Sequence, residues 1–284
     1  MGTPAAPQTP PSLPDLRVVA VADLLLHEQH DTQRSEPLLR RLQADQVLRN
    51  PPIVAAIDGD SRFVVLDGAN RVTAFERMDL PHIVVQVVDY GDVELALNSW
   101  HHLVTGLARE VFNGQLERLA GLIIEPASLL HARAQLARRE ALAFIVHPGQ
   151  DVRTVCVDGT LHERVARLND MVDIYRSSGR IFRVDTDHLE GLLPHYDDVT
   201  ALVVFARHDP AEIIELARLG ARLPAGITRH VIQRRALRVD IPLAELREAK
   251  SLADKNAALD VWVKSKVERK QVRFYQESTF LFDE

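Results

Sequence analysis

Residues 64–71 read Val-Val-Leu-Asp-Gly-Ala-Asn-Arg, so an apolar strand runs into a short polar turn and then into a helix. Gly68 allows the tight turn, and the first N–H groups of the helix that follows have no partner within it. Those groups and the positive end of the helix dipole attract phosphate. Arg71 adds a fork of donors, and Asp67 adds a carboxylate that can hold Mg²⁺ or a water molecule. The segment therefore predicts a phosphate-binding turn in a fold that combines strands and helices.

The composition is that of a globular chain with no strong attraction for polyanions. The 284 residues are 46% apolar and carry a net charge of −6. This length favours about two domains with sizeable cores, and the negative balance argues against binding nucleic acid through overall charge. The single cysteine, Cys156, excludes an intrachain disulfide and a thiolate metal cluster. Because no run approaches 18 apolar residues, we expect a cytoplasmic protein.

Residues 15–103 are expected to form a compact domain of the α+β class with the order β-α-β-β-α-β. Alternating and helical apolar patterns indicate strands at 17–22, 53–57, 62–66 and 82–88, and helices at 34–47 and 70–78. The turn at 58–60, Asp-Gly-Asp, indicates a hairpin. Residues 1–14 are rich in proline and lack periodicity, so we expect a disordered tail there.

Residues 104–284 are expected to form a mixed α/β C-terminal domain. The patterns indicate helices at 107–119, 127–139, 161–175, 210–219 and 243–270, with strands at 142–146, 152–157, 201–206 and 238–241. The arginines between 133 and 139 are interleaved with alanine and leucine and lack aromatic neighbours, which favours a solvated helix face over a nucleic-acid stripe. Cys156 lies in an apolar run and is expected to be a small buried hydrophobe.

Three polar segments are candidates for a site, and each has a plainer interpretation. His27-Glu28-Gln29-His30 does not match a zinc-protease helix, because its histidines are three residues apart rather than four, yet Glu28 stays a candidate acid or base. In most proteins a glutamate in a polar loop is merely solvated. Trp100, His101 and His102 suit a small polar ligand, although a tryptophan at a domain junction is usually an interface anchor.

The third segment is the glycine turn at 224–230, which delivers Thr228 and Arg229 side by side. A guanidinium beside a hydroxyl suits a carboxylate or a phosphate. The alternative interpretation is an ordinary loop with an exposed arginine.

The element order, Glu28 after the first strand and the Asp67-Gly68-x-x-Arg71 turn together resemble the ParB/sulfiredoxin-like superfamily. Ala69 stands where sulfiredoxins carry their catalytic cysteine, so sulfinic-acid reduction is excluded. The chain is most similar to the free serine kinases of this superfamily, the SbnI-like group that includes a kinase encoded with siderophore biosynthesis. The segments that follow the family order, between about residues 15 and 245, are 27–28, 49–54, 66–68 with Arg71, 99–100 with His102, 223–229 and 239–243. One departure is Asn70, where the family usually has histidine.

The resemblance implies a kinase that converts free L-serine to O-phospho-L-serine with ATP or ADP as phosphate donor and Mg²⁺ as cofactor, for amino-acid or siderophore-precursor biosynthesis. It implies catalytic roles for Glu28, the general base, and Asp67, also the metal ligand. It places Arg49, Gly68, Ala69, Asn70 and Arg71 on the nucleotide phosphates. It places Trp100, His101, His102, Thr228 and Arg229 on the amino acid, so that the C-terminal domain completes the substrate pocket, and it allows a homodimer.

Two other functions remain open at this point. One is a ParB-like transcriptional regulator that binds DNA when a nucleotide is bound, although no helix-turn-helix is recognisable after Val104. The other is an inactive relative that only senses a metabolite. Formation of phosphoserine separates the kinase from both, since a sensor would be stabilised by serine without turnover.

Overall fold

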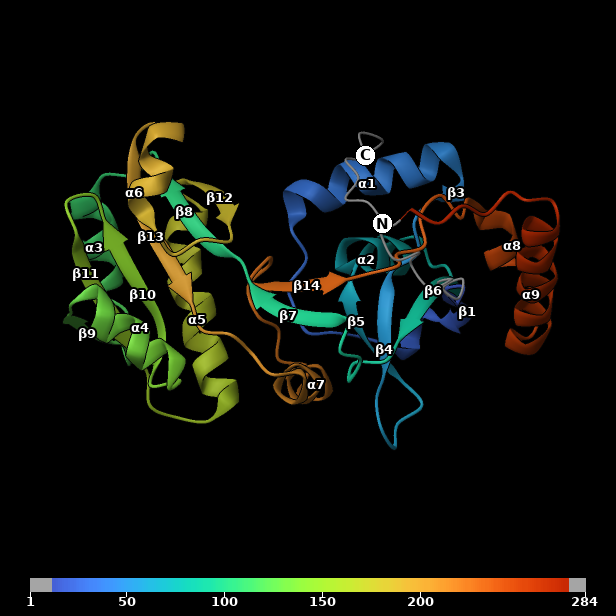
Figure 1. Ribbon diagram of the computed structural model, residues 1–284, viewed down its shortest axis with the longest axis horizontal. Coiled ribbons are helices and arrows are strands. Elements are labelled where there is room, and N and C mark those ends of the chain that lie inside the picture. Colours follow the sequence, from blue (N-terminus) through green and yellow to red (C-terminus); the bar gives the residue numbers. More distant parts are fainter. Residues whose placement is uncertain (1–11, 276–284) are drawn as a thin grey trace, which may run out of the picture.

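The structure is a computed structural model that describes residues 12–275, so most of the tail expected at 1–14 lies outside the described residues. Figure 1 shows two lobes joined by a two-stranded ribbon. The ribbon pairs β7 (Leu95–Ser99) with β14 (Thr228–Ile232) in antiparallel register, and Thr228 lies opposite Ser99. Within residues 12–275, no helix is both long and apolar enough to cross a membrane.

The first lobe is built on a five-stranded sheet in the order β1-β6-β4-β5-β2. Its strands are β1 (Asp15–Ala20), β2 (Leu24–Leu26), β4 (Ile53–Ala56), β5 (Phe63–Asp67) and β6 (His82–Val88). The helices α1 (Thr32–Asp45) and α2 (Ala69–Arg77) pack against each other. A 3-10 turn (Val21–Asp23) separates β1 from β2, and a short β3 (Val47–Leu48) follows α1. The elements expected between residues 17 and 88 are all present, and β2 and β3 are additional.

The last helical segment is two helices rather than the single one expected at 243–270. The structure has α8 (Leu243–Arg247) and α9 (Leu252–Glu268), separated where Glu248 is extended and the Ser251 hydroxyl accepts a hydrogen bond from the backbone of Asp254. The side chain of Asn256 in α9 pairs with both the N–H and the C=O of Val18, each at 2.8 Å. The segment therefore returns to the first lobe and covers its edge strand β1. The strand expected at 238–241 is only β15 (Ile241–Pro242), which pairs with β3.

The second lobe is an antiparallel six-stranded sheet in the order β12-β8-β13-β10-β11-β9. Its strands are β8 (His101–Thr105), β9 (Ile123–Pro126), β10 (Ala141–His147), β11 (Asp151–Cys156), β12 (Arg180–Val184) and β13 (Val199–Phe205). Its helices are α3 (Arg109–Leu116), α4 (Leu129–Ala137), α5 (Leu161–Arg176) and the short α6 (Leu189–Leu192), followed by a 3-10 turn (Leu193–His195). The α+β class is confirmed, whereas β8, β9, β12 and α6 were not expected from the sequence.

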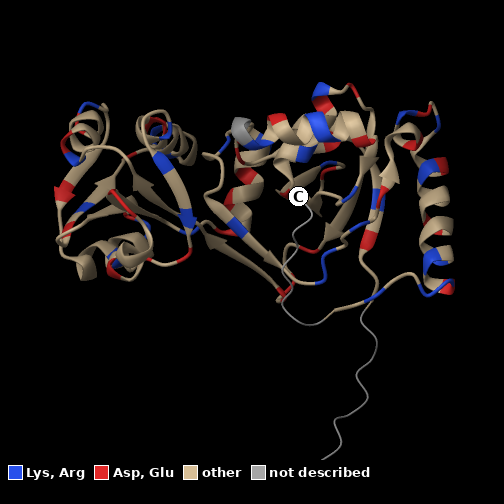
Figure 2. Ribbon diagram, turned by 90° about the horizontal axis from the view of Figure 1, so that it is seen from above, with Lys and Arg blue, Asp and Glu red and all other residues tan. Residues whose placement is uncertain are grey.

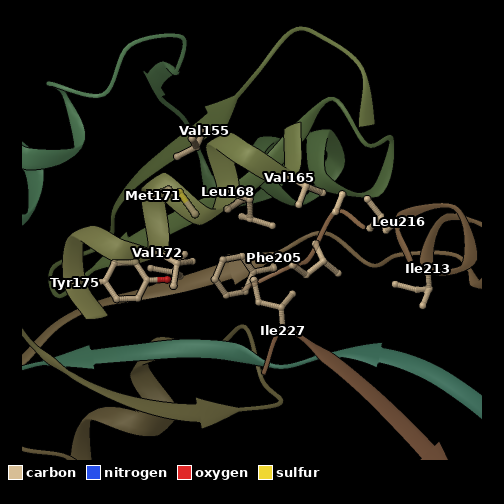
Figure 3. Close-up of a cluster of buried hydrophobic side chains, with 14 of the residues drawn as sticks. Val155, Val165, Leu168, Met171, Val172, Tyr175, Phe205, Ile213, Leu216 and Ile227 are labelled. Atoms are coloured by element: carbon tan, nitrogen blue, oxygen red, sulfur yellow. The ribbon is translucent and has the colours of Figure 1, made fainter. Parts of the chain in front are cut away.

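One continuous apolar core links the lobes. In Figure 3, Leu168, Met171 and Tyr175 of α5 face Phe205 of β13. The same cluster includes residues of β4 and β5 from the first lobe, and α7 (Pro210–Leu219) contacts β2, β5 and α5. Ile227 is fully buried in this cluster, immediately before Thr228. This burial fixes the backbone of the glycine turn that precedes β14.

Candidate functional site

A cavity of about 950 Å³ lies where the first lobe, the ribbon and strand β12 meet. Its walls come from the segment between β2 and α1, from the turn between β5 and α2, and from β14 and the residues before it. The volume is in the range of sites for small ligands and cofactors. Its charged lining is mostly basic and consists of Arg34, Arg41, Arg71, Arg183, Arg229 and Arg235 with Glu28, Asp31 and Asp67. Such a lining attracts a polyanionic ligand.

The turn expected to hold phosphate forms one wall of this cavity. Gly68 has a φ of +100°, and a Cβ there would come within 3.0 Å of the Pro52 Cα, so glycine is required on both counts. Helix α2 begins at Ala69, and Gly68, Ala69 and Asn70 all line the cavity. The first N–H groups of α2, which have no acceptor within the helix, therefore lie at the cavity wall.

Arg71 stabilises this turn through hydrogen bonds to neighbouring residues. Its guanidinium donates to the Asn50 carbonyl at 2.7 Å and to Asp67 at 3.3 Å, and its side chain is 17% exposed. Asp67 has a second basic partner in Arg235. Burial raises the pKa of Asp67, but the charges of Arg71 and Arg235 outweigh burial, so the pKa is lowered overall. The cavity therefore contains an ionised carboxylate at neutral pH.

Asn70, the departure from the family pattern, ties two walls of the cavity together. Its side-chain oxygen accepts a hydrogen bond from the backbone N–H of Asp31 at 3.0 Å. The loop between β2 and α1 is thereby fixed to the start of α2. Any contact of Asn70 with phosphate oxygens would come from its amide N–H groups, because an amide oxygen only accepts hydrogen bonds.

Glu28 reaches the site because its backbone pairs across the lobes. Its segment forms a parallel bridge with Leu223, through Gln29 N–H to the Leu223 carbonyl and Leu223 N–H to the His27 carbonyl, both at 2.8 Å. The carboxylate accepts hydrogen bonds from Gly226 N–H at 2.9 Å and from the N–H and hydroxyl of Thr228, each at 2.5 Å. The glycine turn therefore holds the Glu28 carboxylate at the cavity wall.

Arg183 packs directly on this glycine turn. Gly226 has a φ of +75°, and a Cβ there would lie 2.1 Å from the Arg183 guanidinium. Burial lowers the pKa of Arg183, assisted by the charge of Arg34, while Glu28 and Asp31 oppose this. Arg183 comes from β12, far along the chain, and no motif in the sequence indicated it. Arg235 was missed for the same reason.

Trp100 and Arg229 form a pair next to the glycine turn. The Arg229 guanidinium lies 4.3 Å from the centre of the Trp100 ring, within the range of a cation–π interaction. Arg229 also bonds to Asp185 at 2.7 Å, and the Trp100 N–H donates to the Ile227 carbonyl at 2.8 Å. Both residues line the cavity. The ring of Trp100 and the carboxylate of Asp185 together fix the position of the Arg229 guanidinium.

Three of the expected site residues, Arg49, His101 and His102, do not line the cavity. The Arg49 side chain turns to Asp45, with a 2.8 Å ion pair. His101 and His102 belong to β8, within the six-stranded sheet. The His102 ring is buried against Phe205 and bonds to the Tyr175 hydroxyl at 2.9 Å, while His101 accepts from the Phe205 N–H. The two histidines lie in a strand that the sequence pattern did not reveal, so the structure does not bring them to the cavity.

Burial keeps two histidines neutral and predicts an acid-sensitive fold. Desolvation lowers the pKa of His102 and of His230 to about 3, from an ordinary value of 6.5. Below pH 6.5 these two histidines bind protons in the unfolded chain but not in the folded chain. Their contribution to the free energy of unfolding is therefore full above that pH and is lost as the pH falls toward their folded-state pKa. We expect the free energy of unfolding to fall by about 1.4 kcal/mol per pH unit for each histidine below pH 6. Urea unfolding between pH 4.5 and 8 measures this slope, and His102→Gln removes one histidine's share of it. An unchanged slope in this variant would contradict the prediction.

Asp67 fits a magnesium ion that is shared with a phosphate ligand, rather than one held by protein groups alone. Among residues 12–275, no group of three or more histidine, cysteine, aspartate or glutamate side chains is placed to hold a metal ion. Magnesium sites commonly use one or two carboxylates and complete the coordination with substrate phosphates and water. Asp67 is the first residue of the turn at 67–71, and its carboxylate is ionised. The residues present therefore suit a metal ion that arrives with a nucleotide.

Comparisons with known proteins give one consistent result, although no family model matches the chain. The chain is 24% identical over 235 residues to the ATP-dependent L-serine kinase SbnI of Staphylococcus aureus, with 82% of this chain and 84% of that protein covered. It is 22% identical over 239 residues to an ATP-dependent L-serine kinase of Staphylothermus marinus, with 81% and 90% covered.

Solved structures agree with these relatives. C-terminally truncated SbnI from Staphylococcus aureus superimposes with a TM-score of 0.69 at 19% identity, covering 90% of this chain and 97% of that one. A free serine kinase in complex with AMP gives 0.69 at 17% identity, covering 84% and 95%. These likenesses establish the fold. The resemblance indicated by the motifs is confirmed: in sequence and in fold, the chain is similar to the SbnI-like free serine kinases.

Proposed function

We propose that this protein is an ATP-dependent kinase that phosphorylates free L-serine to O-phospho-L-serine. One observation carries the proposal: the Glu28 carboxylate and the phosphate turn at 67–71 line the same cavity. A proton acceptor and a phosphate site thus stand where one small substrate can meet both. The relatives that match four-fifths of the chain are named ATP-dependent L-serine kinases, which supports this substrate pair.

The nucleotide phosphates bind at the start of α2 in this proposal. The N–H groups at residues 68–70 and the Arg235 guanidinium supply donors, and Asp67 is the residue that would hold Mg²⁺. When bound, the ion neutralises charge on the phosphates and on the leaving group. Arg71 keeps the turn in shape through the Asn50 carbonyl and Asp67.

Serine binds between Glu28 and the Trp100–Arg229 pair. Arg229 receives the serine carboxylate, a group that suits the planar guanidinium fork. Glu28 takes the proton from the serine hydroxyl as its oxygen forms a bond to the terminal phosphorus and the bond from that phosphorus to ADP breaks. We assign Thr228 to Glu28 rather than to the substrate, because both its N–H and its hydroxyl bond to that carboxylate.

The finer architecture is also part of the proposal. We infer an N-terminal domain of the ParB/sulfiredoxin-like type from residue 15 to about 103, with the C-terminal domain following and its last helices, α8 and α9, returning to the first sheet. The expected cytoplasmic location, the homodimer and the siderophore-precursor pathway stay predictions.

The alternative of a DNA-binding regulator is not favoured, since the relatives matched over most of the chain carry kinase names. Figure 2 shows basic and acidic segments interspersed on helices of both lobes. The test is to incubate the purified protein with serine, Mg²⁺ and either ATP or ADP, and to measure phosphoserine by mass spectrometry. We expect product with ATP. Product with ADP alone would change the donor, and no product with either nucleotide would overturn the kinase.

Replacing Arg229 with lysine is expected to raise the KM for serine by about 10- to 100-fold and to change kcat less. Lysine keeps the charge but loses the bidentate fork and weakens the contact with Trp100. Steady-state kinetics at saturating ATP measure the effect. Arg218→Lys is the matched control, because Arg218 bonds to the Asp58 carbonyl and does not line the cavity. Equal KM values for the two variants would contradict the assignment.

A further inference from the structure

His27 stands behind Glu28 in a continuous chain of hydrogen-bonding atoms. Its side chain is 4% exposed, and its Nδ1 lies 2.8 Å from the Val65 carbonyl oxygen. Its Nε2 lies 2.9 Å from the Thr228 hydroxyl oxygen, which in turn lies 2.5 Å from the Glu28 carboxylate. The chain therefore runs from Val65 through His27 and Thr228 to Glu28.

The tautomer of His27 follows from its partners. A carbonyl oxygen only accepts, so Nδ1 carries a proton and donates it to Val65. Burial lowers the pKa of His27, although the charge of Glu28 opposes this. The neutral ring then presents a lone pair at Nε2. The Thr228 hydroxyl has one proton and faces two acceptors, Nε2 of His27 and Oε1 of Glu28.

The two protonation states of Glu28 use this single proton differently. When Glu28 is ionised, the hydroxyl donates to it, and the Thr228 oxygen then faces Nε2 of His27 with lone pair against lone pair at 2.9 Å. When Glu28 is protonated, Oε1 is a weaker acceptor, and the hydroxyl can turn to Nε2 so that every group is paired. Leaving a buried acceptor unpaired costs free energy, so His27 favours the protonated form of Glu28.

We propose that His27 is a positioning residue that makes Glu28 a stronger base, by accepting the Thr228 hydroxyl proton as Glu28 takes the proton of serine. The inference rests on the proposed function. The serine proton moves to Oε2 of Glu28, the bond from serine oxygen to phosphorus forms, and the bond from phosphorus to ADP breaks. The proton of Thr228 stays on Thr228 and changes only its acceptor, and His27 remains neutral throughout.

The hydrogen bonds that the glycine turn donates to Glu28 oppose its role as a base. Its carboxylate accepts three hydrogen bonds from the glycine turn, two of them from backbone groups that cannot turn away. Hydrogen bonds donated to a carboxylate stabilise its charged form. The hydroxyl of Thr228 is the one donor of the three that can be withdrawn as the proton arrives, and His27 is the group that receives it.

Other titratable groups surround His27 without replacing it in this role. The His230 ring of β14 lies edge-on at 5.5 Å between ring centres, and its Nε2 is 2.8 Å from the Tyr90 hydroxyl. His208, which precedes α7, faces His27 at longer range and lowers its pKa slightly. Arg183 faces Glu28, and Asp67 faces His230. Among the described residues, the hydrogen-bond partners of the Thr228 hydroxyl are Glu28 and His27.

Two substitutions at His27 distinguish the effect of the acceptor at Nε2 from the effect of the volume of the ring. The amide of His27→Asn can still donate to the Val65 carbonyl, but it supplies nothing at the Nε2 position. The amide oxygen of His27→Gln can reach that position and accept from Thr228. We expect His27→Asn to move the acid limb of the pH profile of kcat about one pH unit lower and to reduce the plateau of kcat, with the KM for ATP unchanged. His27→Gln should keep the limb near its original position.

Thr228 provides a second arm of the test, and His27→Leu, which also lacks an acceptor at the Nε2 position, replaces His27→Asn if that variant does not fold. Thr228→Val removes one donor from the carboxylate, so the acid limb should move to higher pH, while Thr228→Ser should leave it in place. In the Thr228→Val background, His27→Asn should cause no further shift. A purely structural role for His27 would lower the melting temperature of His27→Asn and leave its acid limb unmoved, whatever the limb of Thr228→Val does, and that result would overturn the proposal.

Titration of the Glu28 carboxyl by ¹³C NMR, without substrates, distinguishes a failure of this inference from a failure of the proposed function. At one fixed acidic pH, we expect the Glu28 carboxyl signal to move toward the ionised position in His27→Asn and toward the protonated position in Thr228→Val, whatever reaction the site catalyses. If the wild-type chain makes phosphoserine but these shifts are absent, the coupling is wrong and the kinase stands. If the shifts are present without phosphoserine, the kinase is wrong.

Discussion

Replacing Glu28 with glutamine is expected to lower kcat for phosphoserine formation by about 10²- to 10⁴-fold. Glutamine has nearly the same shape but cannot take the proton of the serine hydroxyl at neutral pH. The expected loss lies in kcat because the turn at 67–71 and the Trp100–Arg229 pair, to which we assign substrate binding, are unchanged. Steady-state rates of phosphoserine formation measure the effect, and the dissociation constant of ATP measured by calorimetry should change by less than about threefold.

A control for this variant lies on helix α2. Glu76 is exposed and does not line the cavity, so Glu76→Gln should keep the full rate. Glutamine at position 28 also presents an N–H group to the donors of the glycine turn, so the melting temperature of Glu28→Gln must be measured alongside its rate. A folded Glu28→Gln protein with a rate within threefold of wild type would exclude Glu28 as the base.

Replacing Asp67 with asparagine is expected to lower kcat/KM for ATP by about 10²-fold or more. The carboxylate is the counter-charge of Arg71 and Arg235 and is the group suited to Mg²⁺ at the phosphate turn. Asparagine removes the charge with little change in volume. Rates measured over a range of Mg²⁺ concentrations should show a higher requirement for the ion, and calorimetry should show weaker ATP binding in the presence of Mg²⁺.

The matched control for this second variant is Asp58→Asn, at the exposed tip of the hairpin between β4 and β5. It removes the same charge from the same lobe at a position outside the cavity. An Asp67→Asn protein with unchanged Mg²⁺ dependence would show that the ion, if used, is held elsewhere.

The conformation of the turn at 67–71 was predictable because its determinants are local. A strand rich in valine, a glycine at a positive φ and a helix with buried Val72 and Phe75 follow one another within a few residues. The same holds for most elements of the first sheet, whose apolar alternation is clear. Glu28 was indicated by the resemblance and by its position after the first strands.

The remainder of the site depends on contacts between distant segments, which no local pattern contains. Arg183 and Arg235 reach the cavity from β12 and from the end of the ribbon, and Thr228 meets Glu28 only because Leu223 pairs with the backbone beside it. The sequence placed His101 and His102 at the site, whereas the structure does not bring them to the cavity. Two adjacent polar residues look like a ligand site in a sequence, whereas in the structure they belong to a strand whose histidine rings bond within the second lobe.

The central claim is that one cavity brings a phosphate donor to the hydroxyl of free serine. The most direct test is a single turnover with ATP labelled with ³²P in its terminal phosphate, serine, Mg²⁺ and the protein in excess over ATP. We expect the label to appear in phosphoserine in an amount equal to the ADP formed, and we expect Glu28→Gln to abolish this transfer on the same time scale. Label that stays in ATP, or that appears only in inorganic phosphate, would contradict it.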